Sequence, residues 1–274
     1  MNVKLGICNW CVPGSGIFAP KFVSEAGLDG MSIEFGRYEN RYPTMTRQVM
    51  DAYLEAAEAY KIEYPTLVCS GFDYLCFAVH RGDARHEIVR ATLRAAIDSA
   101  AYMKIPMLLI PNFSESALDK TPDAFENAVD MYRYACAYAA DRGVCISCEN
   151  QLHPERSIEL FERVGAPNFS LFYDSDNYFY QRGLDQLEVL KTLYPYLGPQ
   201  LHVKDGKPGV LAGSLLGEGD SGFHAVMDYL RQKQYSGWII LENVYEQQPT
   251  NTFDTDVFGL FTRDVAILKQ AVGA

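Results

Sequence analysis

Four residues of the types that bind divalent metal ions follow four successive apolar runs. Glu149, Asp174, His202 and Glu242 end or closely follow the runs VCISCEN, FSLFYDSDN, QLHVKD and WIILEN. The intervals between these residues are 25, 28 and 40 positions, and each has room for a loop, a helix and the next strand. Three carboxylates and one imidazole around a point suit Mn²⁺, Mg²⁺, Co²⁺ or Zn²⁺.

Residues at four successive strand ends converge on one point where parallel strands close into a barrel. Successive side chains of a strand point to opposite faces, so the predicted strands can be tested for an inward face. Ser147 shares the face of Glu149, and Gln200 shares the face of His202, while the residues between them are apolar. The alternation therefore predicts that the four candidate ligands point into the barrel.

Short apolar runs alternate with helical patterns along the whole chain, which is the rhythm of βα units. The predicted strands are 3–9, 30–35, 64–70, 106–112, 144–149, 169–174, 199–204 and 237–242. The predicted helices are 19–26, 46–60, 84–103, 122–142, 154–164, 183–194, 221–234 and 256–272. Because no linker or low-complexity tract interrupts them, we expect an α/β fold, a (β/α)8 TIM barrel, with residues 1–274 as a single domain.

Charge balance favours a metal at this mouth. Burying a carboxylate without a counter-charge costs several kcal/mol, and Lys204 is the cation obviously near the three acids in sequence. A single strand-end acid is more often a helix cap or an ion-pair partner. Four such residues in successive strands favour a divalent cation.

The composition of the chain limits the kinds of partner that we expect it to bind and the compartment in which we expect it. The 274 residues carry a net charge of −11 with a pI near 4.9, which argues against nucleic-acid binding. No apolar run reaches the ~18–20 residues of a membrane span, and MNVKLGICNW lacks the sections of a signal peptide. Seven cysteines are too few for a disulfide scaffold. We expect a cytoplasmic protein without a membrane or nucleic-acid partner, and homo-oligomerisation stays open.

The chain resembles the sugar phosphate isomerase/epimerase superfamily, the xylose isomerase-like TIM barrels. This superfamily includes ketose 3-epimerases, hydroxypyruvate isomerase, inosose dehydratase and endonuclease IV. The similar segments are DGMSIEF, ISCEN, FYDSDN, LHVKD, LLGEGDSGF and YSGWIILEN, and they span nearly the whole chain. The ordered set of Glu, Asp, His and Glu is a specific signal of the superfamily. It is only a weak signal of any individual activity.

The resemblance implies that Glu149, Asp174, His202 and Glu242 bind one divalent metal ion, with manganese among the expected ions. It also implies that Glu149 and Glu242 are catalytic, one removing a proton α to a carbonyl and the other returning a proton to the opposite face. The metal would stabilise the cis-enediolate. The implied activity is a sugar isomerase or epimerase acting on a ketose or keto-polyol. A lyase or dehydratase that eliminates from a keto-sugar or inosose is the alternative, and a non-catalytic sugar-binding barrel is a third hypothesis.

Two departures from the superfamily pattern limit the site to one metal. Many members carry a histidine three residues after the metal-binding aspartate, where this chain has Asn177. Endonuclease IV also needs histidines after the third and fourth strands, where this chain has Ser70 and Asn112. Together with the acidic charge, these positions argue against a three-zinc DNA-repair enzyme.

Six further residues are candidate substrate contacts: His153, Asn177, Lys204, Trp10, Asn112 and Glu218. His153 either acts as an acid or is an ordinary loop residue. Lys204 either polarises a carbonyl or offsets the carboxylates, and Trp10 either forms an aromatic wall or packs at the rim. Glu218 belongs to the glycine-rich segment 205–222, which is either a wall of the site or a surface excursion. Cys8 and Cys11 are expected to be packing residues.

Overall fold

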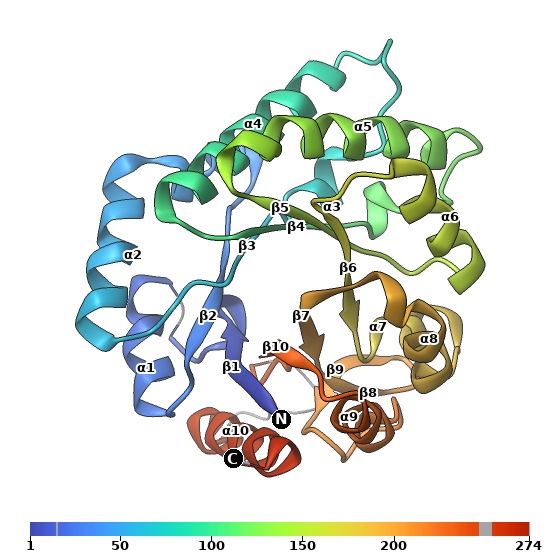
Figure 1. The fold of residues 1–274 in the computed structure, drawn as a ribbon. Helices are drawn as coiled ribbons and strands as arrows, with labels where there is room; N and C mark the ends of the chain where they lie inside the picture. Colours follow the sequence, from blue (N-terminus) through green and yellow to red (C-terminus); the bar gives the residue numbers. More distant parts are fainter. Residues whose placement is uncertain (15, 247–253, 274) are drawn as a thin grey trace.

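Eight parallel strands close into a barrel with a ring of helices around it (Figure 1). The structure is a computed structural model that describes residues 1–14, 16–246 and 254–273. The strands follow one another around the barrel in the order β1-β10-β7-β6-β5-β4-β3-β2. They are β1 (Asn2–Cys8), β2 (Gly30–Glu34), β3 (Thr66–Val68), β4 (Met107–Pro111), β5 (Cys145–Glu149), β6 (Phe169–Asp174), β7 (Leu197–Val203) and β10 (Ser236–Leu241). The predicted TIM barrel and its strands are confirmed.

The predicted outer helices are present with small shifts of their ends. They are α1 (Ala19–Glu25), α2 (Arg47–Tyr60), α4 (His86–Met103), α5 (Ala124–Ala139), α6 (Pro154–Val164), α8 (Gln186–Leu193), α9 (Phe223–Gln232) and α10 (Val257–Val272). The helix predicted over 122–142 begins later, at Ala124, and its last residues form a 3-10 turn before Gly143 adopts a left-handed conformation.

Two short helices were missed, and both lie at the mouth of the barrel: α3 (Phe72–Leu75) after β3, and α7 (Asn177–Arg182) after β6. The prediction of one helix over 183–194 was therefore incomplete. Gly183 ends α7 with a φ of 65°, and Asp185 then caps α8 by accepting a hydrogen bond from the backbone N–H of Glu188. Helices of one or two turns are too short to show a helical period in the sequence.

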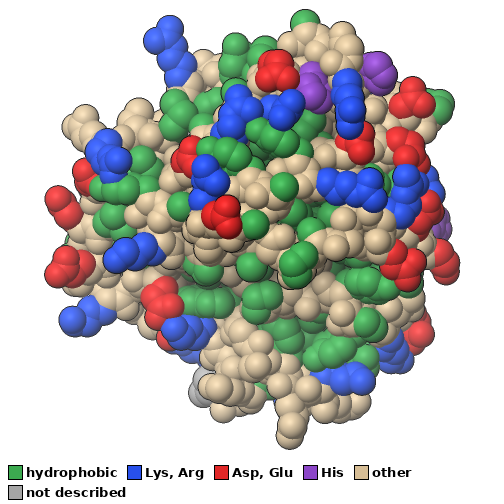
Figure 2. Space-filling view, turned by 45° about the horizontal axis from the view of Figure 1, so that its top comes forward, with side chains coloured by type: hydrophobic (Ala, Val, Ile, Leu, Met, Phe, Trp, Pro, Cys, Tyr) green, Lys and Arg blue, Asp and Glu red, His purple; other side chains and the backbone are tan. Residues whose placement is uncertain are grey.

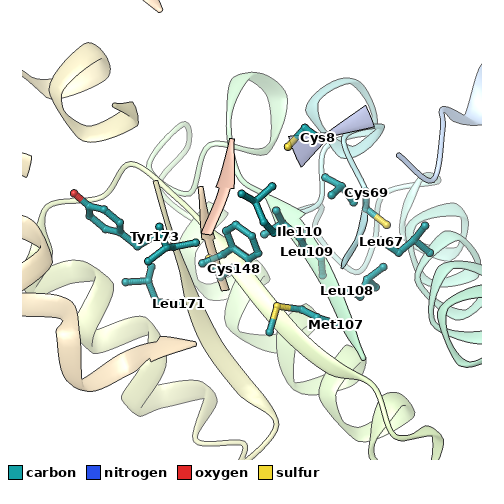
Figure 3. Packing of buried hydrophobic residues seen from close by; sticks show 14 of the residues in the cluster. Cys8, Leu67, Cys69, Met107, Leu108, Leu109, Ile110, Cys148, Leu171 and Tyr173 are labelled. Atoms are coloured by element: carbon teal, nitrogen blue, oxygen red, sulfur yellow. The ribbon is translucent and has the colours of Figure 1, made fainter. Parts of the chain in front are cut away.

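The barrel lumen below the mouth is filled by side chains. Thr66 on β3 donates a hydrogen bond to Gln200 on β7, across the barrel. Above this pair, the ring of Phe172 packs against the ring of His202 with centroids 4.5 Å apart. Buried hydrophobic side chains from β1, β3, β4, β5 and β6 pack together in the core of the barrel (Figure 3). The inward alternation predicted from the sequence is therefore present.

The glycine-rich segment after β7 contains a small hairpin, formed by β8 (Asp205–Lys207) and β9 (Val210–Ser214). The rest of the segment is held by the buried carboxylate of Asp205. This carboxylate accepts hydrogen bonds from the backbone N–H groups of Gly217, Gly219 and Ser221 at 2.8, 3.1 and 3.2 Å. It also accepts one from the Ser221 hydroxyl at 2.7 Å. One side chain thus holds several backbone groups of the segment.

A second buried network ties this segment to the end of β10. Asn243 accepts a hydrogen bond from the Asp205 backbone N–H at 2.9 Å and donates one to Asp264 of α10 at 2.7 Å. Asp264 also accepts from Tyr245 and from the backbone N–H of Leu216, each at 2.8 Å. The network therefore anchors the stretch of chain in which Glu242 lies.

The surface is of mixed charge. On the face shown in Figure 2, Lys and Arg side chains are interspersed with Asp and Glu. Within the described ranges, none of the helices has the length and apolar character that a membrane crossing requires.

The role of Asp205 gives a prediction for stability. In Asp205→Asn, the amide nitrogen would face backbone donors that now bind carboxylate oxygens. We expect the free energy of unfolding to fall by about 1–3 kcal/mol, the usual cost of a buried polar group left without a partner. Urea denaturation measures this change. Asp220→Asn, at an exposed position of the same segment, is the control and should change stability by less than about 0.5 kcal/mol; equal losses in both variants would contradict the role of Asp205.

Candidate metal centre

The four predicted ligands meet at the carboxyl ends of their strands. Glu149 and Asp174 are the last residues of β5 and β6, His202 lies near the end of β7, and Glu242 directly follows β10. One ligand atom from each residue lies within 4.8 Å of those from the others. Asp174 is fully buried, His202 is 1% exposed and Glu149 is 4% exposed. The barrel therefore brings the quartet together at one enclosed point.

The imidazole of His202 is oriented by partners on both of its nitrogens. Its Nδ1 faces Glu149 Oε1 at 3.2 Å, Glu242 Oε2 at 3.3 Å and Asp174 Oδ2 at 3.9 Å. Its Nε2 lies 3.3 Å from Cys8 Sγ. For Nδ1 to offer a lone pair to a metal, the proton must be on Nε2, where the sulfur accepts it. Cys8 is buried in the hydrophobic core, as expected of a packing residue, and its sulfur also contacts the imidazole of His202.

The ammonium group of Lys204 lies between two of the carboxylates. Its Nζ is 2.7 Å from Glu242 Oε2 and 3.1 Å from Asp174 Oδ2. Burial alone would lower the pKa of Lys204, but the surrounding carboxylates outweigh burial and raise the pKa well above its ordinary value. Lys204 is therefore charged and compensates part of the negative charge. Of its two predicted roles, the contacts support this one.

The two glutamates have opposite pKa shifts. Burial raises the pKa of Glu149 to about 7, although His202 opposes this effect. Burial also acts on Glu242, but Lys204 and His202 outweigh it and lower the pKa of that carboxyl. Asn177 supports Glu149 by donating a hydrogen bond to Oε1 at 3.1 Å. Near neutral pH, Glu149 can thus hold or release a proton while Glu242 stays ionised.

These residues fit a single divalent cation. Asp174 Oδ2 is buried, with Lys204 Nζ 3.1 Å away as its charged neighbour, and three carboxylates face one ammonium group. Oxygen ligands with one imidazole suit the hard to borderline ions Mn²⁺, Mg²⁺, Co²⁺ and Zn²⁺. A second cluster, Cys8 with His202 and Glu242, shares two members with the first and lies at the same place.

A cleft of about 340 Å³ opens above the cluster. Glu149, His202, Lys204 and Glu242 form part of its lining. The apolar part of the lining includes Trp10, Phe113 and Leu211, and the polar part includes Ser70, Asp73, Asn177 and Gln181. Leu211 lies on β9, so the hairpin after β7 is a wall of the cleft.

The structure brings some of the candidate substrate contacts to this cleft and not others. Trp10, Asn177 and Lys204 line it. His153 is exposed outside the lining, and Glu218 is an exposed residue that pairs with Arg263 of α10. Asn112 is fully buried behind the cleft, where it accepts a hydrogen bond from Tyr132.

Sequence reasoning missed Asp73, Leu211 and the contact of Cys8 with His202. Asp73 lies in the segment that follows β3, and the short helix α3 carries its side chain to the cleft. An acidic residue within a few positions of a strand end was the available signal. Cys8 is the last residue of β1, so it is a strand-end residue like the quartet, and this position was its signal.

Comparisons with known proteins agree with the barrel. The model of the family described as xylose isomerase-like TIM barrel matches residues 20–257. The 2-epi-5-epi-valiolone 7-phosphate 2-epimerase of Actinoplanes sp. is 28% identical over 89% of this chain and 88% of its own. The structure of D-allulose 3-epimerase from Methylomonas sp. in complex with D-allulose superposes with a TM-score of 0.78, at 16% identity, and covers 98% of this chain and 97% of its own. The IolI protein with a zinc atom has a TM-score of 0.76, at 16% identity, and the match covers 99% of this chain and 98% of that one.

The position of Lys204 gives a prediction for the metal-free protein. Lys204→Met would leave buried carboxylates without their ammonium partner, which typically costs about 3–5 kcal/mol. With a chelator present, we expect the free energy of unfolding to fall by this amount, and added Mn²⁺ should restore much of it. Chemical denaturation with and without Mn²⁺ measures both effects. The matched control is Lys207→Met, at an exposed position of the hairpin; if both variants lost the same stability, the role of Lys204 would be refuted.

The Cys8–His202 contact gives a prediction for metal affinity. Cys8→Ala removes the acceptor for Nε2–H, and loss of such a partner typically weakens metal binding about 10-fold or more. Cys8→Ser keeps an acceptor and should retain most of the affinity. Competition with a fluorescent chelator measures the dissociation constant for Mn²⁺. Cys11→Ala, also at a buried cysteine, is the control, and equal weakening by both alanine variants would contradict the tautomer argument.

Proposed function

The chain belongs to the xylose isomerase-like TIM-barrel family, and on that premise we propose that it is a divalent-metal-dependent sugar epimerase or isomerase. Its substrate would be a ketose or keto-polyol. One observation carries the proposal: the carboxylates of Glu149 and Glu242 line the same cleft from strands that β6 and β7 separate. Inversion at a carbon next to a carbonyl needs two such groups, one to accept a proton and one to donate a proton.

The two glutamates reach the cleft from different sides. β5 and β10 are separated in the barrel by β6 and β7, so their side chains can flank a substrate. Glu242, kept ionised by Lys204, would take the proton α to the carbonyl, and the resulting enediolate would be reprotonated by Glu149. In the reverse reaction the roles exchange. A divalent metal held by the quartet would polarise the substrate carbonyl.

Other residues of the chain would orient the proton carriers and exclude water. Asn177 holds Glu149 through the hydrogen bond to Oε1. Trp10, Phe113 and Leu211 provide apolar walls beside the reacting carbon. A shielded cleft protects an enediolate from solvent, because water would otherwise compete in the proton transfers.

The relatives support epimerase chemistry on this scaffold. The Actinoplanes relative is named as a 2-epimerase of a 7-phosphate, and the Methylomonas structure contains D-allulose. The alternative, elimination from a keto-sugar, requires an acid for the leaving group. His153 was the candidate for that acid, but it lies outside the lining of the cleft. Its position therefore does not support elimination.

The proposal predicts the effect of neutralising either glutamate. With Mn²⁺ bound, Glu149→Gln and Glu242→Gln should each lower α-proton exchange by at least ~100-fold, the usual scale of general acid–base catalysis. Exchange into ketoses in D₂O, followed by NMR, measures this loss, and metal analysis of each variant separates it from loss of the ion. Glu155→Gln, at an exposed position of α6, should exchange like the unaltered protein.

Three results would overturn the proposal. They are near-normal exchange in both glutamine variants, full activity after removal of metal by a chelator, and loss of water from the substrate in place of exchange. The first would refute the proton carriers, the second the metal, and the third would establish elimination.

A further inference from the structure

A second cavity lies in the outer layer of the barrel, between the neighbouring helices α4 and α5 (Figure 1). Its volume is about 390 Å³, and its lining has no residue in common with that of the cleft above the metal cluster. This volume suits a small organic ligand. The charged, imidazole and amide side chains of its lining are Arg81, His86, Glu87, Arg90, Asn127 and Asp130.

Arg90 of α4 offers this cavity a hydrogen-bond donor that the protein does not use. Its Nε is buried and has no hydrogen-bond partner in the described part of the chain. Its Cζ lies over the ring of Tyr134, 4.0 Å from the ring centre, and the Tyr134 hydroxyl is bound by Arg94 at 2.7 Å. The guanidinium is therefore held in place while its Nε–H stays unpaired. A buried donor without an acceptor is costly, so an acceptor on a ligand would be stabilising.

The other donors of the cavity are weakly committed to protein partners. His86 is 15% exposed and its Nδ1 lies 3.4 Å from Glu87 Oε1, which leaves the second ring nitrogen without a partner among the residues that the structure describes. The Asn127 amide makes no described side-chain hydrogen bond. Arg81 pairs with Asp130 at 2.8 Å, but the two side chains are 75% and 49% exposed. Exposed pairs of this kind are weak, so the Arg81 guanidinium can turn to a ligand.

The charge around the cavity favours an anion. Both carboxylates of the lining are already opposed by arginines, Glu87 by Arg90 and Asp130 by Arg81. Between residues 81 and 94 the chain has four arginines and two carboxylates, although its net charge is −11. The cavity also lies at the amino end of α4, a helix of 18 residues, where the helix dipole adds partial positive charge. A ligand that brings acceptors and negative charge therefore matches what the lining leaves unused.

We propose that this cavity is a binding site for a small phosphate monoester. The donors come from the segment before α4, from α4 and from α5, and a phosphate group offers three oxygens to such an arrangement where a carboxylate offers two. Arg90 Nε–H binds one oxygen, and Arg81 leaves Asp130 to bind another. His86 and Asn127 donate to the remaining acceptors. The organic part of the ester fills the rest of the cavity beside Tyr134.

Calorimetry on the full chain without added metal tests this site, with glycerol 3-phosphate, inorganic phosphate and succinate as probes. We expect glycerol 3-phosphate to bind with a dissociation constant of about 1 mM or less, and about 10-fold more tightly than either other probe. Arg90→Gln should weaken its binding by about 10-fold or more, because a charge-assisted hydrogen bond is lost. Arg85→Gln removes the same charge from a neighbour outside the lining and should change the affinity by less than about 2-fold.

Asp130→Asn provides a test that damage to the fold would not mimic. It releases Arg81 and removes a negative charge, so glycerol 3-phosphate should bind about 3-fold more tightly or better. Urea unfolding curves of each variant establish that the fold is retained.

Four results would overturn the inference. They are no binding of glycerol 3-phosphate at about 10 mM, equal weakening in Arg90→Gln and Arg85→Gln, weaker binding in Asp130→Asn, and binding of inorganic phosphate or succinate as tight as that of the ester. Binding that requires Mn²⁺ and is unchanged in Arg90→Gln would place the ester at the barrel mouth and would also refute this site. Exchange of α-protons in D₂O is measured separately, so neither result decides the other.

Discussion

The mouth of this barrel has to satisfy one electrostatic constraint. Three carboxylates are buried there around one imidazole nitrogen. Each carboxylate alone would be unfavourable away from water, and together they repel one another. Lys204 offsets part of the charge, and Asn177 and Cys8 fix the directions of Glu149 and His202. The same electrostatic competition shifts the pKa values of the two glutamates in opposite directions. Burial and its compensation therefore also set the conditions for the proposed proton transfer.

The barrel and the quartet could be predicted because both follow from short-range patterns. A period of two along β5 and β7 places Glu149 and His202 inward, and closure of parallel strands brings their ends together. The contact between Cys8 and His202 depends on which strands meet after closure, since 194 positions separate the two residues. Asp73 was missed because its helix has four residues. His153 and Glu218 were placed at the site because a sequence shows where a strand ends and not the direction in which the following loop turns.

The scaffold supports the site through buried carboxylates of a different kind. Asp205 and Asp264 touch no other charged group among the hydrogen bonds described above, and backbone or side-chain donors surround their oxygens. Through Asn243 they join the segment after β7, the end of β10 and α10. Glu242 and the hairpin wall with Leu211 belong to these joined pieces, so the wall and one of the proposed proton carriers are held in a common frame. Hydrogen bonds fix positions here, while at the cluster unbalanced charge is retained for chemistry.

Lys204 has a consequence for how the protein is made. Because its ammonium group lies between Asp174 and Glu242, the chain carries an internal substitute for part of the cation charge. Acquisition of the proposed ion would then not have to precede folding. A binding site that is already folded takes its ion from the surrounding pool, and the relative abundance of competing ions decides occupancy as much as intrinsic affinity does. The identity of the bound metal would in that case reflect the state of the cell.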